Sequence, residues 1–349
     1  MLDWQTLVRL PDKALARLDI AAMNLACAQG LPGSDRIDWE FCLKTLDDWA
    51  RRCAGFTKRV IPYFHQGRCD FPHSEPRFRI QAMITHLQRD IGVRYHPGRK
   101  AETDVFQPED SFVYGVIQGE GGTCGNLPTI YTAVGRRLGY PMMLATTRTH
   151  GFCRWDLLPR GDCFNIEASG EGVSFFPDEH YRSGRFEMSP ETVAACGYLE
   201  SLSPRQEVAK FMGQRASCWM REKNYGEAAI SFAWATELDP RRQQFYLYLT
   251  WQSIKKWKET VQSRLPSRLF PNLDLGLPAQ QFRSLSRELE REMIGLRVLE
   301  GLLCNPVYER RWWEPLRRCP TVRPVGMPDI LSVDFRWNRP GHEAILTVK

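Results

Sequence analysis

The chain has 349 residues, of which 43% are hydrophobic and 25% are charged, a composition typical of a folded globular protein and not of a disordered one. This length favours two or three domains over one continuous core. The net charge of +6 is mildly basic, but Lys and Arg are mostly interleaved with Asp and Glu, which does not favour a nucleic-acid-binding protein.

Targeting signals and cysteine usage indicate the compartment. Residues 1–7 lack the basic start and long apolar run of a secretory signal, and no run of about 18 apolar residues predicts a spanning helix. The eleven cysteines are odd in number and include no Cys-x-x-Cys pair, which indicates reduced thiols. We therefore expect a cytoplasmic protein without membrane contact, metal or cofactor.

Residues 1–105 are expected to form a helical region. Two stripes of apolar residues repeat at helical spacing: Trp39, Leu43, Leu46 and Trp49, then Ile80, Met83, Ile84 and Leu87. Ser34 or Asp35 is the candidate N-cap of the first helix. Pro97, Gly98 and Pro108 then predict a loop that leads into the middle of the chain.

The middle segment, 106–198, predicts a small α+β domain. A glycine-rich stretch from Gln118 leads into an apolar helix, which we expect to start at Cys124 or Gly125 and to end near Leu138. Strand-forming residues follow at 142–147, 150–158 and 163–169. The order of one helix and three strands favours an antiparallel sheet that faces one end of the helix.

Residues 199–305 are expected to be helical again. Tyr225, Ala228, Phe232, Ala235, Leu238 and Pro240 match the second helix of a tetratricopeptide unit. An ordinary helical hairpin packed on the middle domain explains the same pattern equally well. A long helix is predicted from Pro278 to Leu303, and 306–349 predicts a small β segment, with strands at 330–337 and 344–348 forming a hairpin.

Cys124 is the candidate nucleophile. A thiol attacks carbonyls as the thiolate, so its pKa of about 8.5 has to fall. A start of the helix at this residue places the sulfur at the positive end of the helix dipole. The glycines before it are expected to leave room for a substrate backbone to approach the sulfur.

A base from a separate element has to complete the site. His150, at the start of the strand after the helix, meets this requirement, although a lone histidine in a strand is more often structural. In the next strand, alternation puts Asn165 and Glu167 on one face, so either side chain is a candidate to orient the imidazole. Glu171 is a further candidate for this role. Gln118 is the candidate second donor to an oxyanion.

Several segments together resemble the transglutaminase-like superfamily, which has the papain-like cysteine fold: Gln118, 122–126, 136–141, 149–152 and 165–168. The resemblance implies Cys124 as nucleophile, His150 as base and Glu167 at the position where the family has Asp. Because of this Glu for Asp replacement, Asn165, the residue type that papain-like enzymes use, remains a candidate for the same role. The flanking helices are similar to a bacterial subgroup with C-terminal tetratricopeptide-like helices.

The leading hypothesis is a cysteine-dependent amide-bond enzyme, a peptidase or deamidase, that acts on a protein or peptide substrate through a thioester. A protein-crosslinking transglutaminase is the alternative enzyme. A non-enzymatic scaffold that holds a partner peptide with the C-terminal helices is a second class. A nucleic-acid-associated protein is the third, based on the basic-aromatic clusters at 255–258 and 310–318.

Overall fold

The computed structural model describes residues 2–71, 73–99, 107–119, 121–147, 149–183 and 188–242, scattered positions from 246 to 260, and the strands 333–338 and 343–348. The helix predicted at 278–303 lies outside these residues. So do the basic-aromatic cluster at 310–318 and part of the one at 255–258.

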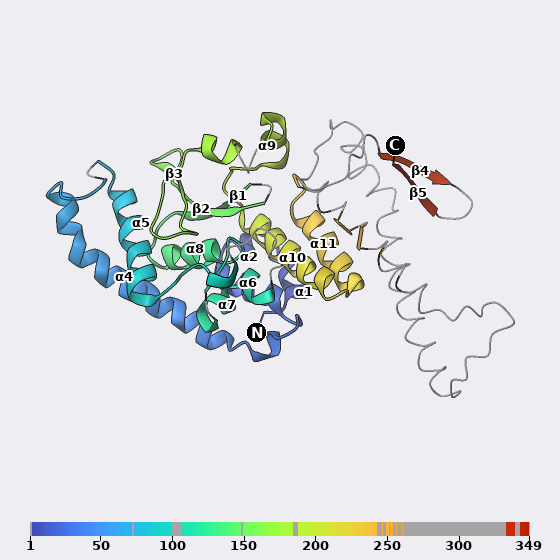
Figure 1. The fold of residues 1–349 in the computed structure, drawn as a ribbon, viewed down its shortest axis with the longest axis horizontal. Coiled ribbons are helices and arrows are strands. Elements are labelled where there is room, and N and C mark those ends of the chain that lie inside the picture. The colour runs from blue at the N-terminus through green and yellow to red at the C-terminus, as the bar shows by residue number, and fades with distance from the viewer. Residues whose placement is uncertain are drawn as a thin grey trace.

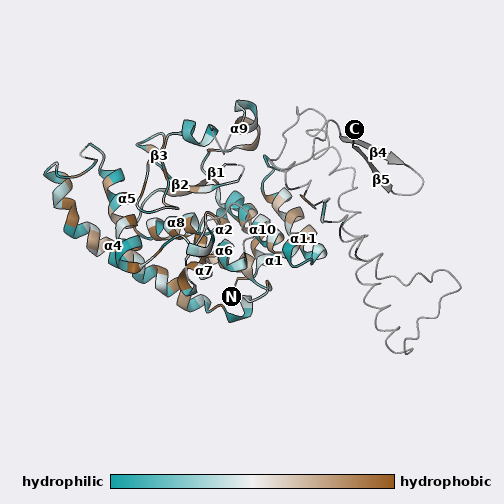
Figure 2. Ribbon diagram, viewed as in Figure 1, coloured by the Kyte–Doolittle hydropathy of each residue, from teal (hydrophilic) through white to brown (hydrophobic). Residues whose placement is uncertain are grey.

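The N-terminal region is helical, as predicted. It contains α1 (Trp4–Leu7), α2 (Asp12–Leu15), α3 (Ile20–Ala28), α4 (Trp39–His65) and α5 (Glu75–Thr85), and a wider helical turn, η2 (His86–Ile91), continues α5. Figure 2 shows hydrophobic and hydrophilic residues alternating along α4, which packs one face on the core. The predicted N-caps of α4, Ser34 and Asp35, are wrong. The N-cap is Asp38, whose carboxylate accepts a hydrogen bond from Phe41 N at 2.9 Å. Ser34 and Asp35 instead form a short 3-10 turn, η1 (Ser34–Arg36).

Two short helices that were not predicted, α6 (Pro108–Ser111) and α7 (Val113–Gln118), follow η3 (Pro97–Arg99). The predicted order of one helix and three strands then follows as α8 (Leu127–Arg137), β1 (Met142–Thr146), β2 (Gly151–Asp156) and β3 (Cys163–Ile166). The strands form one antiparallel sheet in the order β1-β2-β3. The α+β class predicted from the sequence is therefore confirmed.

The two faces of this sheet pack on different layers (Figure 1). Cys153, on one face, donates from Sγ to Pro128 O of α8 at 3.2 Å. The other face packs in a small aromatic cluster around Phe152 and Tyr181, next to η4 (Asp178–Arg182) and α9 (Pro190–Cys196). The start of α8 and the start of β2 thus come together beneath one end of the sheet.

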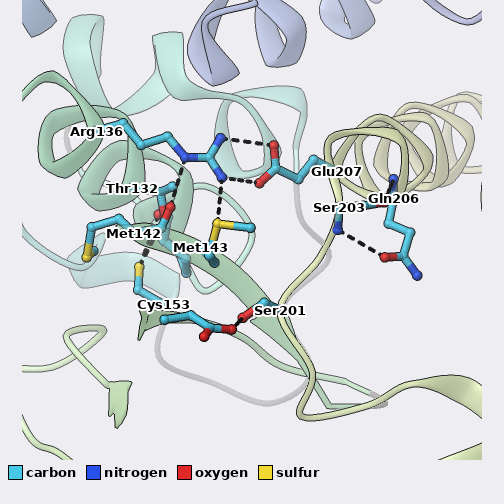
Figure 3. Close-up of polar contacts among 11 residues, drawn as sticks. Thr132, Arg136, Met142, Met143, Cys153, Ser201, Ser203, Gln206 and Glu207 are labelled. Atoms are coloured by element: carbon cyan, nitrogen blue, oxygen red, sulfur yellow. Dashed lines mark hydrogen bonds and ion pairs between the residues drawn. The ribbon is translucent and has the colours of Figure 1, made fainter. Parts of the chain in front are cut away.

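The helices α10 (Pro204–Arg221) and α11 (Tyr225–Leu238) form the predicted hairpin. Figure 3 shows how α10 is tied to α8: the Arg136 guanidinium donates to both carboxylate oxygens of Glu207, at 2.6 and 3.1 Å. Before α10, Leu199 N and Leu202 N donate to Thr146 O and Leu144 O along the outer edge of β1. One hydrophobic cluster therefore runs from Leu7 through α8 and the sheet to α10 and α11.

Near the C-terminus, β4 (Val333–Asn338) pairs antiparallel with β5 (Glu343–Val348), which confirms the predicted terminal hairpin. Within the described part of the chain, none of the helices combines the length and the apolar character that crossing a bilayer requires.

Candidate active site

Cys124 lies in a turn that leads into α8, and not on the helix itself. The regular helix starts three residues later than its earliest predicted start, at Leu127, with Asn126 as N-cap. Leu127 N nevertheless donates to Thr123 O at 3.0 Å, the i to i−4 bond of an α-helix. Cys124 thus occupies a helical turn that precedes α8, and its side chain is half-buried.

Three buried polar groups hold this turn. Thr123 N donates to Asn126 Oδ1 at 2.8 Å, and Thr123 Oγ1 donates to Asp110 O at 2.6 Å. The Asn126 amide nitrogen donates to Glu109 O and Phe112 O, at 2.7 and 3.0 Å. None of these bonds uses the Cys124 side chain, so its sulfur is left for chemistry.

The glycines before Cys124 serve the packing of the chain itself. A methyl group added at Gly121, whose φ is +145°, would lie 2.8 Å from Arg94 O. One added at Gly122 would lie 2.6 Å from Asn126 Oδ1 and 2.7 Å from Val116 Cγ2. We expected these glycines to clear a path for substrate, but both are buried and closely surrounded by the protein.

His150 is placed by the short turn between β1 and β2. Thr147 N donates to His150 O at 2.8 Å, and His150 N donates to Thr147 Oγ1 at 3.0 Å. The imidazole is only 8% exposed and lies parallel to the rings of Phe152 and Tyr181, with centroids 6.5 and 6.4 Å away. Next to it, a methyl group added at Gly151 would lie 3.0 Å from Cys124 O. This close approach brings the start of β2 against the Cys124 turn.

His150 forms its hydrogen bond with Glu167, whereas Asn165 bonds other residues. His150 Nε2 lies 2.6 Å from Glu167 Oε2, which also accepts from Tyr181 OH at 3.3 Å. Asn165 Oδ1 instead accepts from Arg154 Nε at 2.8 Å, while its amide nitrogen donates to Asp178 Oδ1 at 2.8 Å. Of the two candidates for the orienting role, the geometry favours Glu167.

The three groups are coupled electrostatically. Burial disfavours the charged form of His150, but hydrogen bonds to Cys124 and to Glu167 outweigh it and raise the His150 pKa to about 9. Burial likewise opposes the charge of Glu167, but the hydrogen bond and charge of His150 hold the Glu167 pKa below its ordinary value. Because Nε2 faces Glu167, Nδ1 is the ring nitrogen left for Cys124. The arrangement favours an imidazolium that is paired with the Glu167 carboxylate and hydrogen-bonded to Cys124.

Gln118 is the last residue of α7 and its side chain is exposed. Val116, on the same helix, touches Gly122, so α7 borders the glycine loop that leads to Cys124. The role of Gln118 as an oxyanion donor stays a prediction.

Sequence reasoning missed three side chains at this site. Tyr181 donates to Glu167, and Lys210 and Gln214 of α10 both donate to Gly125 O, at 3.1 and 2.9 Å. These residues lie 14 to 89 positions from their partners, so no local spacing could have indicated them. In the described ranges, no group of three or more His, Cys, Asp or Glu side chains is arranged to hold a metal ion.

Replacing Glu167 by glutamine is expected to lower the His150 pKa from about 9 towards the ordinary value of about 6.5. The imidazolium that stabilises the Cys124 thiolate then forms less readily at neutral pH, so alkylation of Cys124 at pH 7 should slow by roughly tenfold, while the rates near pH 10 should converge. Alkylation of Cys124 by iodoacetamide between pH 5 and 10 measures this profile. The exposed Glu171→Gln is the matched control, and an unchanged profile in Glu167→Gln would contradict the coupling.

Comparison with known proteins identifies no relative: no family model matches the chain, and neither a curated protein nor a solved structure is similar to it at a significant level.

Proposed function

We propose that this chain is a cysteine-dependent amide-bond hydrolase, a peptidase or deamidase of the transglutaminase-like type, with a papain-like core formed by α8 and the sheet. The single observation that carries the proposal is the coupled set Cys124, His150 and Glu167. A thiol at a helix entrance, an imidazole and a carboxylate in hydrogen-bonded series are what acyl transfer through a thioester requires.

The first half of the reaction forms the thioester. His150 takes the thiol proton, and the Cys124 thiolate adds to the carbonyl carbon of a peptide or carboxamide. The C–N bond then breaks as the imidazolium returns its proton to the leaving nitrogen, which departs as a neutral amine or ammonia. Glu167 holds the ring in one tautomer and stabilises its positive charge throughout.

The second half consumes water. His150 removes a proton from a water molecule, the hydroxide adds to the thioester carbon, and the C–S bond breaks to release a carboxylic acid. The protein returns to its resting state with Cys124 and His150 as before. If an amine takes the place of water, the same steps form a new amide, which is the crosslinking alternative.

The oxyanion of each tetrahedral intermediate needs hydrogen-bond donors. The backbone N–H of Cys124 has no acceptor among the described residues, which leaves it available for this role. We assign the second donor to the Gln118 side chain, which is exposed at the end of α7 beside the glycine loop.

Trapping the acyl-enzyme tests the proposal. The full-length protein is mixed with a proteome-derived peptide pool, quenched in acid within seconds and mapped by mass spectrometry. We expect a hydroxylamine-sensitive acyl adduct on Cys124 and none on Cys163, which is exposed at the far end of β3. Added methylamine distinguishes the two enzymes, since a crosslinking enzyme would produce methylamides faster than acids.

The absence of any adduct on Cys124, combined with alkylation of Cys124 no faster than that of Cys163 at pH 6, would contradict the enzyme. Those two results together would favour the peptide-binding scaffold.

A further inference from the structure

Helix α10 borders the candidate site next to the turn that carries Cys124. Lys210 Nζ and Gln214 Nε2 lie one helical turn apart and both donate to the carbonyl oxygen of Gly125, the residue after Cys124. A methyl group added at Gly125 would lie 3.2 Å from Gln214 Nε2. The helix therefore contacts the turn of the nucleophile directly.

The Lys210 side chain also reaches the junction of Cys124 and β2. A methyl group added at Gly151 would lie 3.0 Å from Cys124 O and 3.6 Å from Lys210 Cε. The aliphatic part of Lys210 therefore packs where the chain before β2 meets the Cys124 backbone, and its ammonium group interacts electrostatically with Cys124.

Lys210 is a half-buried cation that forms no ion pair with a described carboxylate. The nearest acid along α10, Glu207, is fully buried and uses both oxygens to pair with Arg136. A partly desolvated charge without a counter-ion is less stable than a paired one, so an anion beside Lys210 is favoured. The Cys124 thiolate is the anion that this position offers.

We propose that Lys210 is a positioning residue that stabilises the Cys124 thiolate and, together with Gln214, fixes the Gly125 peptide, so that the site is complete only while α10 is docked against this turn. The inference rests on the proposed function, since it assigns a role in the same site.

The groups around Lys210 define its charge state. Burial lowers the Lys210 pKa to about 8, while the charges of Cys124, Glu207 and Cys153 oppose this shift and that of Arg242 adds to it. Lys210 thus mostly carries its proton at pH 7 and has lost it from about half of the molecules near pH 8. His150, which also contacts Cys124, keeps its proton to a higher pH.

The pH dependence of Cys124 alkylation by iodoacetamide in the full chain tests the inference without needing the substrate. In Lys210→Met we expect the midpoint of Cys124 reactivity to rise by about one pH unit, which is a reaction up to about tenfold slower at pH values below the midpoint. Lys210→Arg should restore most of the rate because it retains the charge. Lys44→Met on α4, where the lysine side chain is 73% exposed, makes the same substitution at a remote place and should change nothing.

Two further variants separate charge from structure. Lys210→Gln keeps a hydrogen-bond donor but not the charge, and it should behave like Lys210→Met. Gln214→Met removes a donor to Gly125 O and no charge, so it should leave the midpoint in place. Circular dichroism checks that each variant is folded. If Lys210→Met does not fold, the alkylation profile of Lys210→Gln tests the role of the charge in its place.

The outcomes of the alkylation experiment are distinguishable. A low midpoint in the unaltered protein that is the same in Lys210→Met and Lys210→Gln overturns the role of Lys210 and leaves the proposed function standing. A midpoint in the unaltered protein as high as that of Cys163 overturns the proposed function itself.

Discussion

Replacing Cys124 by alanine is expected to abolish turnover and leave the fold intact. In the proposed reaction the sulfur is the protein atom that forms a bond to the substrate, so its loss should reduce the rate by about 10³-fold or more. The turn that carries it is held by the side chains of Thr123 and Asn126. Removing one half-buried sulfur should therefore change the free energy of unfolding by no more than about 1 kcal/mol.

Hydrolysis of a peptide found in the trapping experiment measures turnover, and thermal unfolding measures the fold. Cys163→Ala is the matched control, because it removes an exposed thiol from the same sheet. Activity in Cys124→Ala equal to that of the control would end the assignment of the nucleophile.

Replacing His150 by alanine is expected to remove the thiolate at neutral pH and to stop both halves of the reaction. Without the imidazole no neighbouring base takes the Cys124 proton, so alkylation at pH 6 should slow by at least about tenfold. At pH 9 the alkylation rates of the variant and the unaltered protein should converge, because hydroxide then removes the proton. Peptide hydrolysis should stay low even there, since no acid remains to protonate the leaving nitrogen.

His180→Ala is the control for this variant. That imidazole is exposed, stacks on Phe176 with ring centroids 3.9 Å apart, and meets the Tyr181 ring edge-on at 5.1 Å. Its removal therefore changes the histidine content next to the site without removing Cys124, His150 or Glu167. Alkylation of His150→Ala at pH 6 that is as fast as in His180→Ala would show that the imidazole does not activate the thiol.

Comparison of His150→Ala with the unaltered protein also tests how His150 contributes to stability. The pKa of His150 is raised in the folded protein, to about 9, from about 6.5 in an unfolded chain. Its contribution to stability is therefore fully present below pH 6.5 and is lost as the pH rises through 9. The unfolding temperature of the unaltered protein should fall over this range, and that of His150→Ala should fall less.

The sequence predicts the local features of the site well, because they depend on short-range patterns. The apolar stripe of α8, the order of the strands and the separate elements that carry Cys124 and His150 all follow from periodicity and turn residues. The choice between Asn165 and Glu167 did not follow, since alternation puts both on one face. It depends on the pairing of Arg154 with Asn165 in the sheet, which puts Glu167 near the strand end where His150 lies.

Other parts of the site depend on tertiary contacts that leave no mark in the sequence. In the sequence, the glycines of the loop suggest an opening for substrate. In the structure, Gly121 and Gly122 leave no room for a side chain, because Arg94 and Asn126 lie too close to them. The regular helix begins at Leu127, after Asn126, because the Asn126 side chain forms hydrogen bonds with the segments that precede the helix. Lys210 could not be found from the sequence, because its relation to Gly125 exists only once α10 has packed.

The covered edge of β1 has a consequence for how this protein meets other copies of itself. An unpaired strand edge invites the strands of neighbouring molecules and so promotes aggregation. Leu199 and Leu202 occupy the carbonyls of Thr146 and Leu144 from within the same chain, so this side of the sheet cannot act as a template. The strand that leads into the His150 turn is thereby protected from intermolecular pairing, and cleavage of the chain between α9 and α10 would remove that protection.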